Sequence, residues 1–342
     1  STDSGKDMVM VTVDSTLTLE GEGQDNDPFS ENYGSGYGTY IIGDAKEYFY
    51  GVTFNVGTYA SIITEGYGYY GSSNFDTIDV YPLKRILTGE TAYDWMGNPY
   101  DAYVTEDADE PVFTGIKGEG KNTIINSDAF GFMAHNNGEL IITDGTEVNT
   151  DNATFLMKAG NVDITVSGGA QINTEDGMIL QMLDNDDSIV GADFSQGPPN
   201  FFTEFFEREG YPGINYDVDV TTERRNTITF TAEDVALEGD LYNGTGLFGG
   251  QAGDVLKVTL GAGSSLTGDI SSTSIIHVDE NGEQNTYFTI DEYYYLGHVA
   301  NRVYYSGAND VEVAVIDGAS WTVEDECPIN SLTLDSASII KA

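Results

Sequence analysis

The segment Leu140-Ile-Ile-Thr-Asp-Gly-Thr-Glu-Val-Asn-Thr-Asp (residues 140–151) recurs 24 positions later as Ile164-Thr-Val-Ser-Gly-Gly-Ala-Gln-Ile-Asn-Thr-Glu (164–175). Each copy has alternating apolar residues, a glycine turn, one further apolar residue and a polar Asn-Thr-acid corner. Alternation with a period of two indicates a strand, and a strand-containing repeat of about 20–25 residues is typical of stacked parallel strands. We therefore predict an all-β fold, namely a right-handed parallel β-helix (a solenoid) with several long inserted loops.

Stacked repeats would place equivalent apolar residues in continuous columns, with members one strand spacing (about 4.8 Å) apart. A shared glycine position would suit a corner with positive φ, and two asparagines at one position could form an inner amide ladder. The predicted columns are Leu140/Ile164/Val258/Val313, Ile142/Val166/Leu260/Val315 and Val148/Ile172/Leu266/Trp321, with Gly145, Gly169, Gly263 and Gly318 at the corner and Asn149 and Asn173 in the ladder.

We interpret residues 1–342 as a single domain, because the repeat returns after each irregular stretch. The expected parts are an N-terminal coil or cap (1–23), irregular coils with insertions (24–110), regular coils (111–183), an insertion with a short helix at 201–208 (184–226), coils (227–278), a tyrosine-rich insertion (279–306) and C-terminal coils (307–342).

The charge of the chain excludes some classes of partner. It has 57 acidic and 13 basic residues, which gives a formal net charge of −44. Such a surface repels nucleic-acid phosphates and anionic lipid headgroups, so we expect no nucleic-acid partner. No apolar run is long enough for a membrane helix, and Cys327 is the only cysteine, so neither membrane insertion nor an intrachain disulfide is expected.

The last repeats contain Gly318-Ala-Ser-Trp-Thr-Val and Ile329-Asn-Ser-Leu-Thr-Leu-Asp. These phrases resemble the late coils of autotransporter passenger domains and related adhesin-like surface proteins, which are bacterial extracellular parallel β-helix proteins. The resemblance implies a secreted, cell-surface location, with the signal peptide already removed, and a non-catalytic structural or adhesin role. The expected partners are a glycan or protein surface, or copies of the chain stacked end to end into a filament.

Acidic loops are candidate calcium sites, because hard carboxylate oxygens suit Ca²⁺. None of them has the spacing of an EF-hand loop, and the alternative is that they are simply solvated. The candidate ligands are Asp184, Asp186, Asp187, Asp107 and Asp109.

Aromatic loops are candidate partner contacts, because exposed rings can stack on sugars or dock on a protein surface. The alternative is that these rings pack the inserted loops onto the outside of the coil. The candidate residues are Tyr69, Tyr70, Phe205, Phe206, Tyr293, Tyr294 and Tyr295.

An enzyme is the less favoured interpretation. Carbohydrate-active β-helix enzymes use clustered aspartates with a basic residue that stabilises developing negative charge. Asp186-Asp187 and Gly297-His298 faintly match that set, but its Arg-x-Lys partner is missing. We therefore expect no catalysis and no cofactor other than calcium. The alternative function is a carbohydrate-active protein, either a glycan binder or a glycoside hydrolase or lyase.

Overall fold

The computed structural model describes residues 8–19, 37–93, 99–134, 137–157, 160–183, 226–245, 254–277, 299–303 and 309–342. Every regular element in these ranges is a β-strand, and most strand pairs are parallel. The all-β class is therefore confirmed. Within the same ranges, no helix is long and apolar enough to cross a membrane.

The largest sheet has 15 strands and divides into two wings that share the long strands β3 (Tyr37–Tyr50) and β5 (Tyr59–Gly71). The first half of β5 pairs with one wing and its second half with the other. The front wing also contains β1 (Val9–Val13), β12 (Gly138–Ile142), β15 (Val162–Ser167), β18 (Thr227–Glu233), β21 (Val255–Leu260), β25 (Asp310–Val315) and β27 (Ser331–Leu334). The rear wing contains β11 (Phe130–Ala134), β14 (Ala153–Met157), β17 (Met178–Leu183), β20 (Asp240–Gly244) and β23 (Ile270–His277), with β24 (Val299–Val303) antiparallel to β23.

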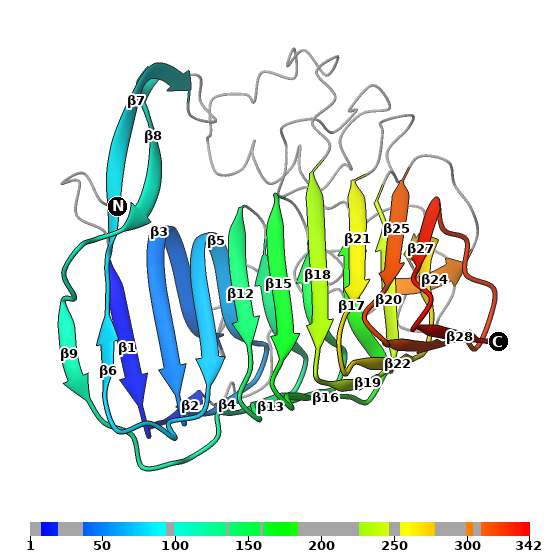
Figure 1. Cartoon of the computed structure of the whole chain (residues 1–342), viewed down its shortest axis with the longest axis horizontal. Coiled ribbons are helices and arrows are strands. Elements are labelled where there is room, and N and C mark those ends of the chain that lie inside the picture. Colours follow the sequence, from blue (N-terminus) through cyan, green and yellow to red (C-terminus); the bar gives the residue numbers. More distant parts are fainter. Residues whose placement is uncertain are drawn as a thin grey trace, which may run out of the picture.

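Two smaller parallel sheets form the base of the molecule. The chain passes from a base strand to the rear wing, then to the front wing and back to the base, and each passage advances toward the C-terminal end (Figure 1). The first base sheet contains β2 (Thr16–Leu19), β4 (Thr53–Val56), β10 (Ile124–Ser127), β13 (Glu147–Thr150) and β16 (Gln171–Thr174). The second contains β19 (Ala236–Glu238), β22 (Ser265–Thr267), β26 (Ser320–Thr322) and β28 (Ile339–Lys341).

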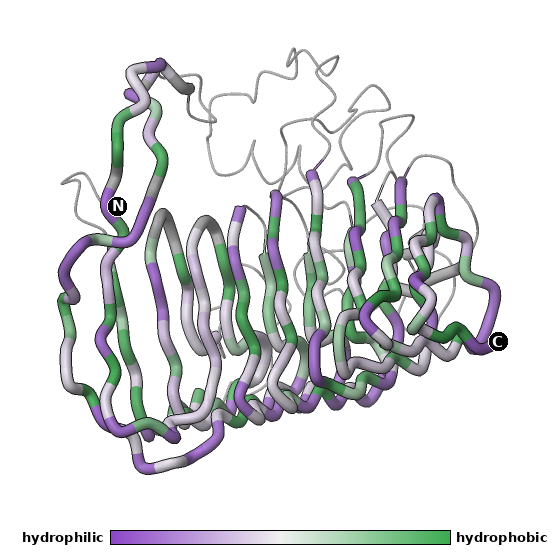
Figure 2. Tube along the Cα trace, in the orientation of Figure 1, coloured by the Kyte–Doolittle hydropathy of each residue, from purple (hydrophilic) through white to green (hydrophobic). Residues whose placement is uncertain are grey.

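The two columns predicted in the front wing are confirmed, with one additional member each. Leu140 pairs with Ile164, and Phe230 lies between Ile164 and Val258. In the neighbouring column, Ala232 lies between Val166 and Leu260. The members of both columns are buried, and Figure 2 shows hydrophobic and hydrophilic residues alternating along these strands. Burial of each large apolar member contributes on the order of 1.5–3 kcal/mol.

The predicted third column is interrupted. Val148 pairs with Ile172 in the first base sheet, and Leu266 pairs with Trp321 in the second. No ladder joins the two sheets, because β16 ends one and β19 begins the other. The column therefore consists of two shorter columns separated at the junction between β16 and β19.

The predicted glycine corner is confirmed. The backbone of Gly145, Gly169, Gly263 and Gly318 has φ between 68° and 82°. Four aspartates at the same kind of corner also have positive φ, namely Asp14, Asp144, Asp234 and Asp317. Aspartate tolerates this conformation better than most residues, so these corners can differ in sequence without a change of path.

Aromatic rings fill the interior of the first half of the stack. Phe49 stacks on Tyr70 at 5.0 Å between ring centroids, and Tyr70 meets Phe132 edge-on at 4.9 Å. Phe132 stacks on Phe155 at 5.5 Å. All four side chains are fully buried, so the aromatic stack forms the core of this region.

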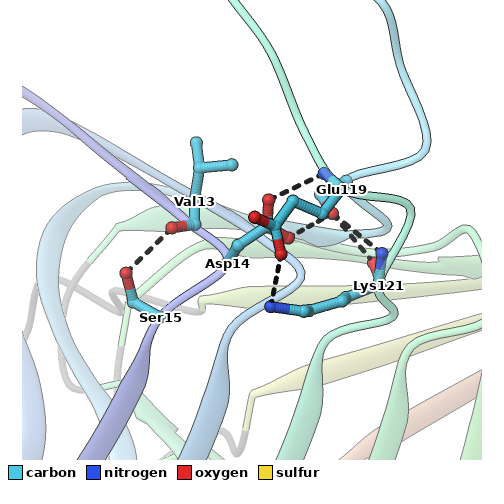
Figure 3. Close-up of polar contacts among 6 residues, drawn as sticks. Val13, Asp14, Ser15, Glu119 and Lys121 are labelled. Atoms are coloured by element: carbon cyan, nitrogen blue, oxygen red, sulfur yellow. Dashed lines mark hydrogen bonds and ion pairs between the residues drawn. The ribbon is translucent and has the colours of Figure 1, made fainter.

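The N-terminal end carries strands that lie outside the stack. An antiparallel hairpin, β7 (Leu83–Tyr93) and β8 (Pro99–Asp107), projects from the body, and β6 (Ile78–Val80) pairs with β9 (Phe113–Ile116) beyond β1 (Figure 1). Asp14, at the corner between β1 and β2, anchors this segment to the stack, because it accepts a hydrogen bond from Ser73 Oγ. It also accepts one from the Glu119 backbone N–H at 2.7 Å (Figure 3). The Lys121 ammonium pairs with Glu119 at 2.8 Å.

Of the predicted insertions, the structure describes only residue 226 of 184–226 and residues 299–303 of 279–306, which form β24. The helix expected at 201–208 lies outside the described residues. In the region expected to be irregular, β3, β4 and β5 stack directly on their neighbours, and the Gly66–Gly71 phrase belongs to β5.

Candidate functional site

Four tyrosines gather on the outer face of the front wing, and we call this surface the tyrosine face. Tyr48 and Tyr50 come from β3, and Tyr67 and Tyr69 come from β5. Tyr48 lies beside Tyr69 in the strand register. The ring centroids of Tyr48 are 5.4 Å from Tyr67 and 6.0 Å from Tyr69, and those of Tyr50 and Tyr69 are 5.2 Å apart. Strand alternation and parallel register therefore place four rings in one continuous surface.

The tyrosine face is partly exposed and carries neutral phenols. Tyr48, Tyr67 and Tyr69 are half-buried, whereas Tyr50 is only 6% exposed. Burial is the main cause that raises the pKa of all four phenols, and the negative charge of Asp144 raises the pKa of Tyr69 further. At neutral pH these hydroxyls keep their protons, so they can donate hydrogen bonds.

Charged side chains border the tyrosine face. The hydroxyl of Tyr69 donates a hydrogen bond to Asp144 Oδ2 at 3.2 Å. The Lys46 ammonium lies 5.5 Å from the centre of the Tyr67 ring and forms an ion pair with Asp107 at the end of β8. Glu139 of β12 lies beside Tyr67 in register. The rings are thus surrounded by both donors and acceptors.

Of the five tyrosines predicted as partner contacts, the two that the structure describes, Tyr69 and Tyr70, lie on opposite sides of β5. Tyr69 lies on the tyrosine face. Tyr70 has no exposed area and packs between Phe49 and Phe132, so it is a core residue and its ring is not available to a partner. Phe205, Phe206, Tyr293, Tyr294 and Tyr295 lie outside the described residues.

The described calcium candidates face lysines. Asp107 pairs with Lys46, and Asp109 lies 3.4 Å from the Lys84 ammonium. Asp107 thereby fastens the base of the β7–β8 hairpin to the front wing. In the part of the chain that the structure describes, no three His, Cys, Asp or Glu side chains gather as a metal site. Asp184, Asp186 and Asp187 are outside that part.

A concave surface, which we call the acidic groove, lies where the two base sheets meet. Its volume is about 690 Å³. Carboxylates line it from both sides of the junction, and at Asp151 burial together with Glu175, Asp128 and Asp176 raises the pKa. The lining carboxylates are Asp128, Asp151, Glu175, Glu238, Asp240 and Glu324.

An asparagine ladder lies on one wall of this groove. Asn173 Nδ2 donates to Asn149 Oδ1 at 2.8 Å, Asn149 donates to Asn126 at 3.0 Å, and Asn126 donates to Asn55 at 2.9 Å. The predicted stacking of Asn149 on Asn173 is therefore confirmed, but the prediction that the ladder is internal is wrong. Val148 points inward, so Asn149, the next residue, points outward and is only half-buried.

Replacing Asn149 with alanine is expected to lower the free energy of unfolding by about 1–2 kcal/mol. The change removes bonds to Asn126, Asn173 and Glu147 at a partly exposed position. The midpoint of urea unfolding measures the effect. Asn173→Ala is the matched control, because Asn173 ends the ladder and the smaller loss expected there is under about 1 kcal/mol. If the two variants lost equal free energies of unfolding, the hydrogen bonds along the ladder would not be cooperative.

Comparison with known proteins does not identify the chain: it matches no family model, and no similar curated protein or solved structure was found.

Proposed function

We propose that this chain is a right-handed parallel β-helix with long inserted loops and that it is a non-catalytic, adhesin-like extracellular protein that binds neutral glycans on its tyrosine face. The parallel pairing of each front strand with the next, and the regular passage from base to rear wing to front wing, support the helical path. The right-handed sense follows because crossovers between parallel strands of one sheet are almost always right-handed.

The observation that carries the binding proposal is the grouping of Tyr48, Tyr67 and Tyr69 as half-buried rings on one face of the front wing. Aromatic rings pack against the apolar faces of sugars, and the neighbouring polar groups can bond sugar hydroxyls. Lys46 and the phenols supply donors, while Asp144 and Glu139 supply acceptors.

Charge selects among glycans. With a net charge of −44, the protein repels uronates and other acidic sugars at long range, especially at low salt. Neutral sugars experience no such repulsion. The neutral state of the phenols supports a binding role over a catalytic one, because a protonated phenol is a poor nucleophile and a poor base.

The proposal also covers where the protein is located and which ion it binds. The acidic composition with many Tyr and Gly residues, together with the predicted resemblance to bacterial surface proteins, supports an extracellular place. Calcium bound by acidic loops would screen the repulsion between the negative charges of the chain. This supports the proposal that calcium is the ion that the protein binds.

The test is a glycan array followed by calorimetric titration with the neutral oligosaccharide that binds best. Tyr67→Ala and Tyr69→Ala are each expected to weaken binding roughly two- to thirteen-fold, because each removes one stacking ring worth about 0.5–1.5 kcal/mol. Tyr81→Ala is the control, since Tyr81 is an exposed tyrosine outside the tyrosine face. The proposal fails if no neutral glycan binds, or if binding is unchanged in both face variants.

A further inference from the structure

One row of side chains continues the tyrosine face across the outer side of the front wing. Tyr48 pairs in register with Tyr69, Tyr69 pairs with Ile141, and the row passes from strand to strand as far as β27 (Figure 1). Neighbouring members are about 4.8 Å apart, so the row crosses the strands. Every member is at least partly exposed. We call this row the outer track, and its members are Tyr48, Tyr69, Ile141, Thr165, Thr231, Thr259, Ala314 and Thr333.

The outer track is uncharged, although the row beside it on the same face is not. That second row lies two residues earlier on each strand, and its charged members are Lys46, Glu139, Asp163, Lys257 and Glu312. The outer track contains neither an acid nor a base, in a chain whose net charge is −44. A ligand that lies on the outer track therefore removes no charged side chain from water, which would be costly.

The threonines of the outer track have hydroxyls that the protein leaves unused. Thr165, Thr231 and Thr259 come from neighbouring strands of the front wing. Among the residues that the structure describes, none accepts a hydrogen bond from these three hydroxyls. Beside the outer track, in contrast, the hydroxyl of Ser167 donates to Thr143 at 3.0 Å. Each free hydroxyl can donate to a ligand and accept from it, while its methyl group contacts an apolar ring face.

We propose that the tyrosine face and the outer track together bind an extended, β-linked chain of neutral sugars. The chain lies across the strands, with its first rings on Tyr48 and Tyr69 and later units on the threonines. This proposal rests on the proposed function and adds the class of ligand, namely the interior of a polysaccharide chain instead of a single terminal sugar. The strand spacing of about 4.8 Å is close to the length of one sugar unit in such a chain. An α-linked glucose chain curves, so it would leave the outer track after a few units.

Calorimetric titration with cello-oligosaccharides of increasing length tests the proposal. Malto-oligosaccharides are the comparison, because they contain the same neutral sugar in an α-linked chain. In the cello series the dissociation constant is expected to fall at least about ten-fold from the disaccharide to the hexasaccharide, which requires about 1.4 kcal/mol from the added contacts. The malto series is expected to show no fall beyond the trisaccharide.

Thr231→Glu separates the outer track from the tyrosine face. It places a larger, charged side chain in the middle of the outer track, so we expect it to remove most of the gain with length and to leave disaccharide binding unchanged. Thr229→Glu is the matched control, because Thr229 lies on the same strand and the same face, between Asp163 and Lys257 in the charged row. It adds the same charge and is expected to preserve the gain.

Three results would overturn the outer track as a binding surface. They are equal affinity for the cello disaccharide and hexasaccharide, an equal gain with length in the malto series, and equal effects of Thr231→Glu and Thr229→Glu. The tyrosine face would survive each of them, because it requires only that short neutral sugars bind. Absence of binding by every cello-oligosaccharide would also overturn this proposal, whereas the glycan array decides separately whether the tyrosine face binds another neutral glycan.

Discussion

Replacing Glu47 with glutamine is expected to stabilise the protein by about 3 kcal/mol at pH 8 and to change its stability little at pH 4. Glu47 lies on β3 between Lys46 and Tyr48, which belong to the outer face, so its own side chain points into the core. It is 4% exposed, and its Oε2 atom has no hydrogen-bond partner. Burial raises the pKa of this carboxyl from 4.5 to about 7, against the smaller opposing effect of a hydrogen bond with Thr39.

The direction of the pH effect follows from the two pKa values. Below pH 4.5 the carboxyl is protonated in both the folded and the unfolded chain, so it does not penalise folding. Between pH 4.5 and about 7 the unfolded chain loses its proton first, and the folded state loses about 1.4 kcal/mol per pH unit. Above about pH 7 both states are ionised and the penalty is constant. Glutamine carries no charge, so the Glu47→Gln variant does not have this penalty.

Urea unfolding from pH 4 to pH 8 measures this difference. Glu147→Gln is the matched control, because it removes the same charge from a side chain on the outer side of β13, where Glu147 accepts a hydrogen bond from Asn149. The difference between wild type and Glu47→Gln should grow with pH, and by more than the difference between wild type and Glu147→Gln. Parallel pH curves for the two variants would show that Glu47 is not a buried acid in solution.

The inward position of Glu47 could not be predicted from its sequence neighbours. The phrase Lys46-Glu47-Tyr48-Phe49-Tyr50 has large amphipathic side chains at every second position and does not show which set faces the core. The structure shows which set faces the core. Gly68, on the neighbouring strand β5, pairs with Glu47. A Cβ atom at Gly68 would lie 3.1 Å from both Leu140 and Tyr70, so the glycine leaves the space that the inward side chains fill.

The same ambiguity explains why Tyr70 was expected at the surface. In Gly66-Tyr-Gly-Tyr-Tyr-Gly71 two tyrosines are adjacent, so one must face inward in a strand, and composition alone does not tell which. The asparagine ladder is a different case. Val148 was correctly predicted as inward, and strict alternation already implies that Asn149 points outward. The sequence therefore contained that signal.

The regular repeats were predictable because one face of each strand is consistently apolar there. A slip of one residue would turn Leu140 and Ile142 to solvent, and this penalty fixes the register. The base column was less predictable between Ile172 of the first base sheet and Leu237, which pairs with Leu266 in the second. A long irregular stretch separates the two residues in the sequence. Across such a stretch, side-chain periodicity does not show whether the strands before and after it are hydrogen-bonded to each other.

Replacing Ile164 with aspartate is expected to lower the free energy of unfolding by more than about 4 kcal/mol, a large part of the roughly 5–15 kcal/mol by which native proteins are stable. Ile164 is 1% exposed and lies in register between Leu140 and Phe230. A carboxylate there would lose its hydration among apolar neighbours, and the cavity left by the smaller side chain would add to the cost. The column runs through the neighbouring strands of the front wing, so the substitution would also destabilise the strands on both sides of β15.

Thr165→Asp is the matched control, since Thr165 is the next residue on the same strand and lies on the outer face beside Ile141 and Thr231. Its expected cost is under about 1 kcal/mol, mostly from added negative charge. Ile164→Val, which keeps the site apolar, is expected to cost about 0.5–1.5 kcal/mol. Far-UV circular dichroism and urea unfolding measure all three variants. If Ile164→Asp unfolded at the same urea concentration as Thr165→Asp, the inward column of the front wing would be wrong, because a column open to water is the only arrangement in which the two positions are equivalent.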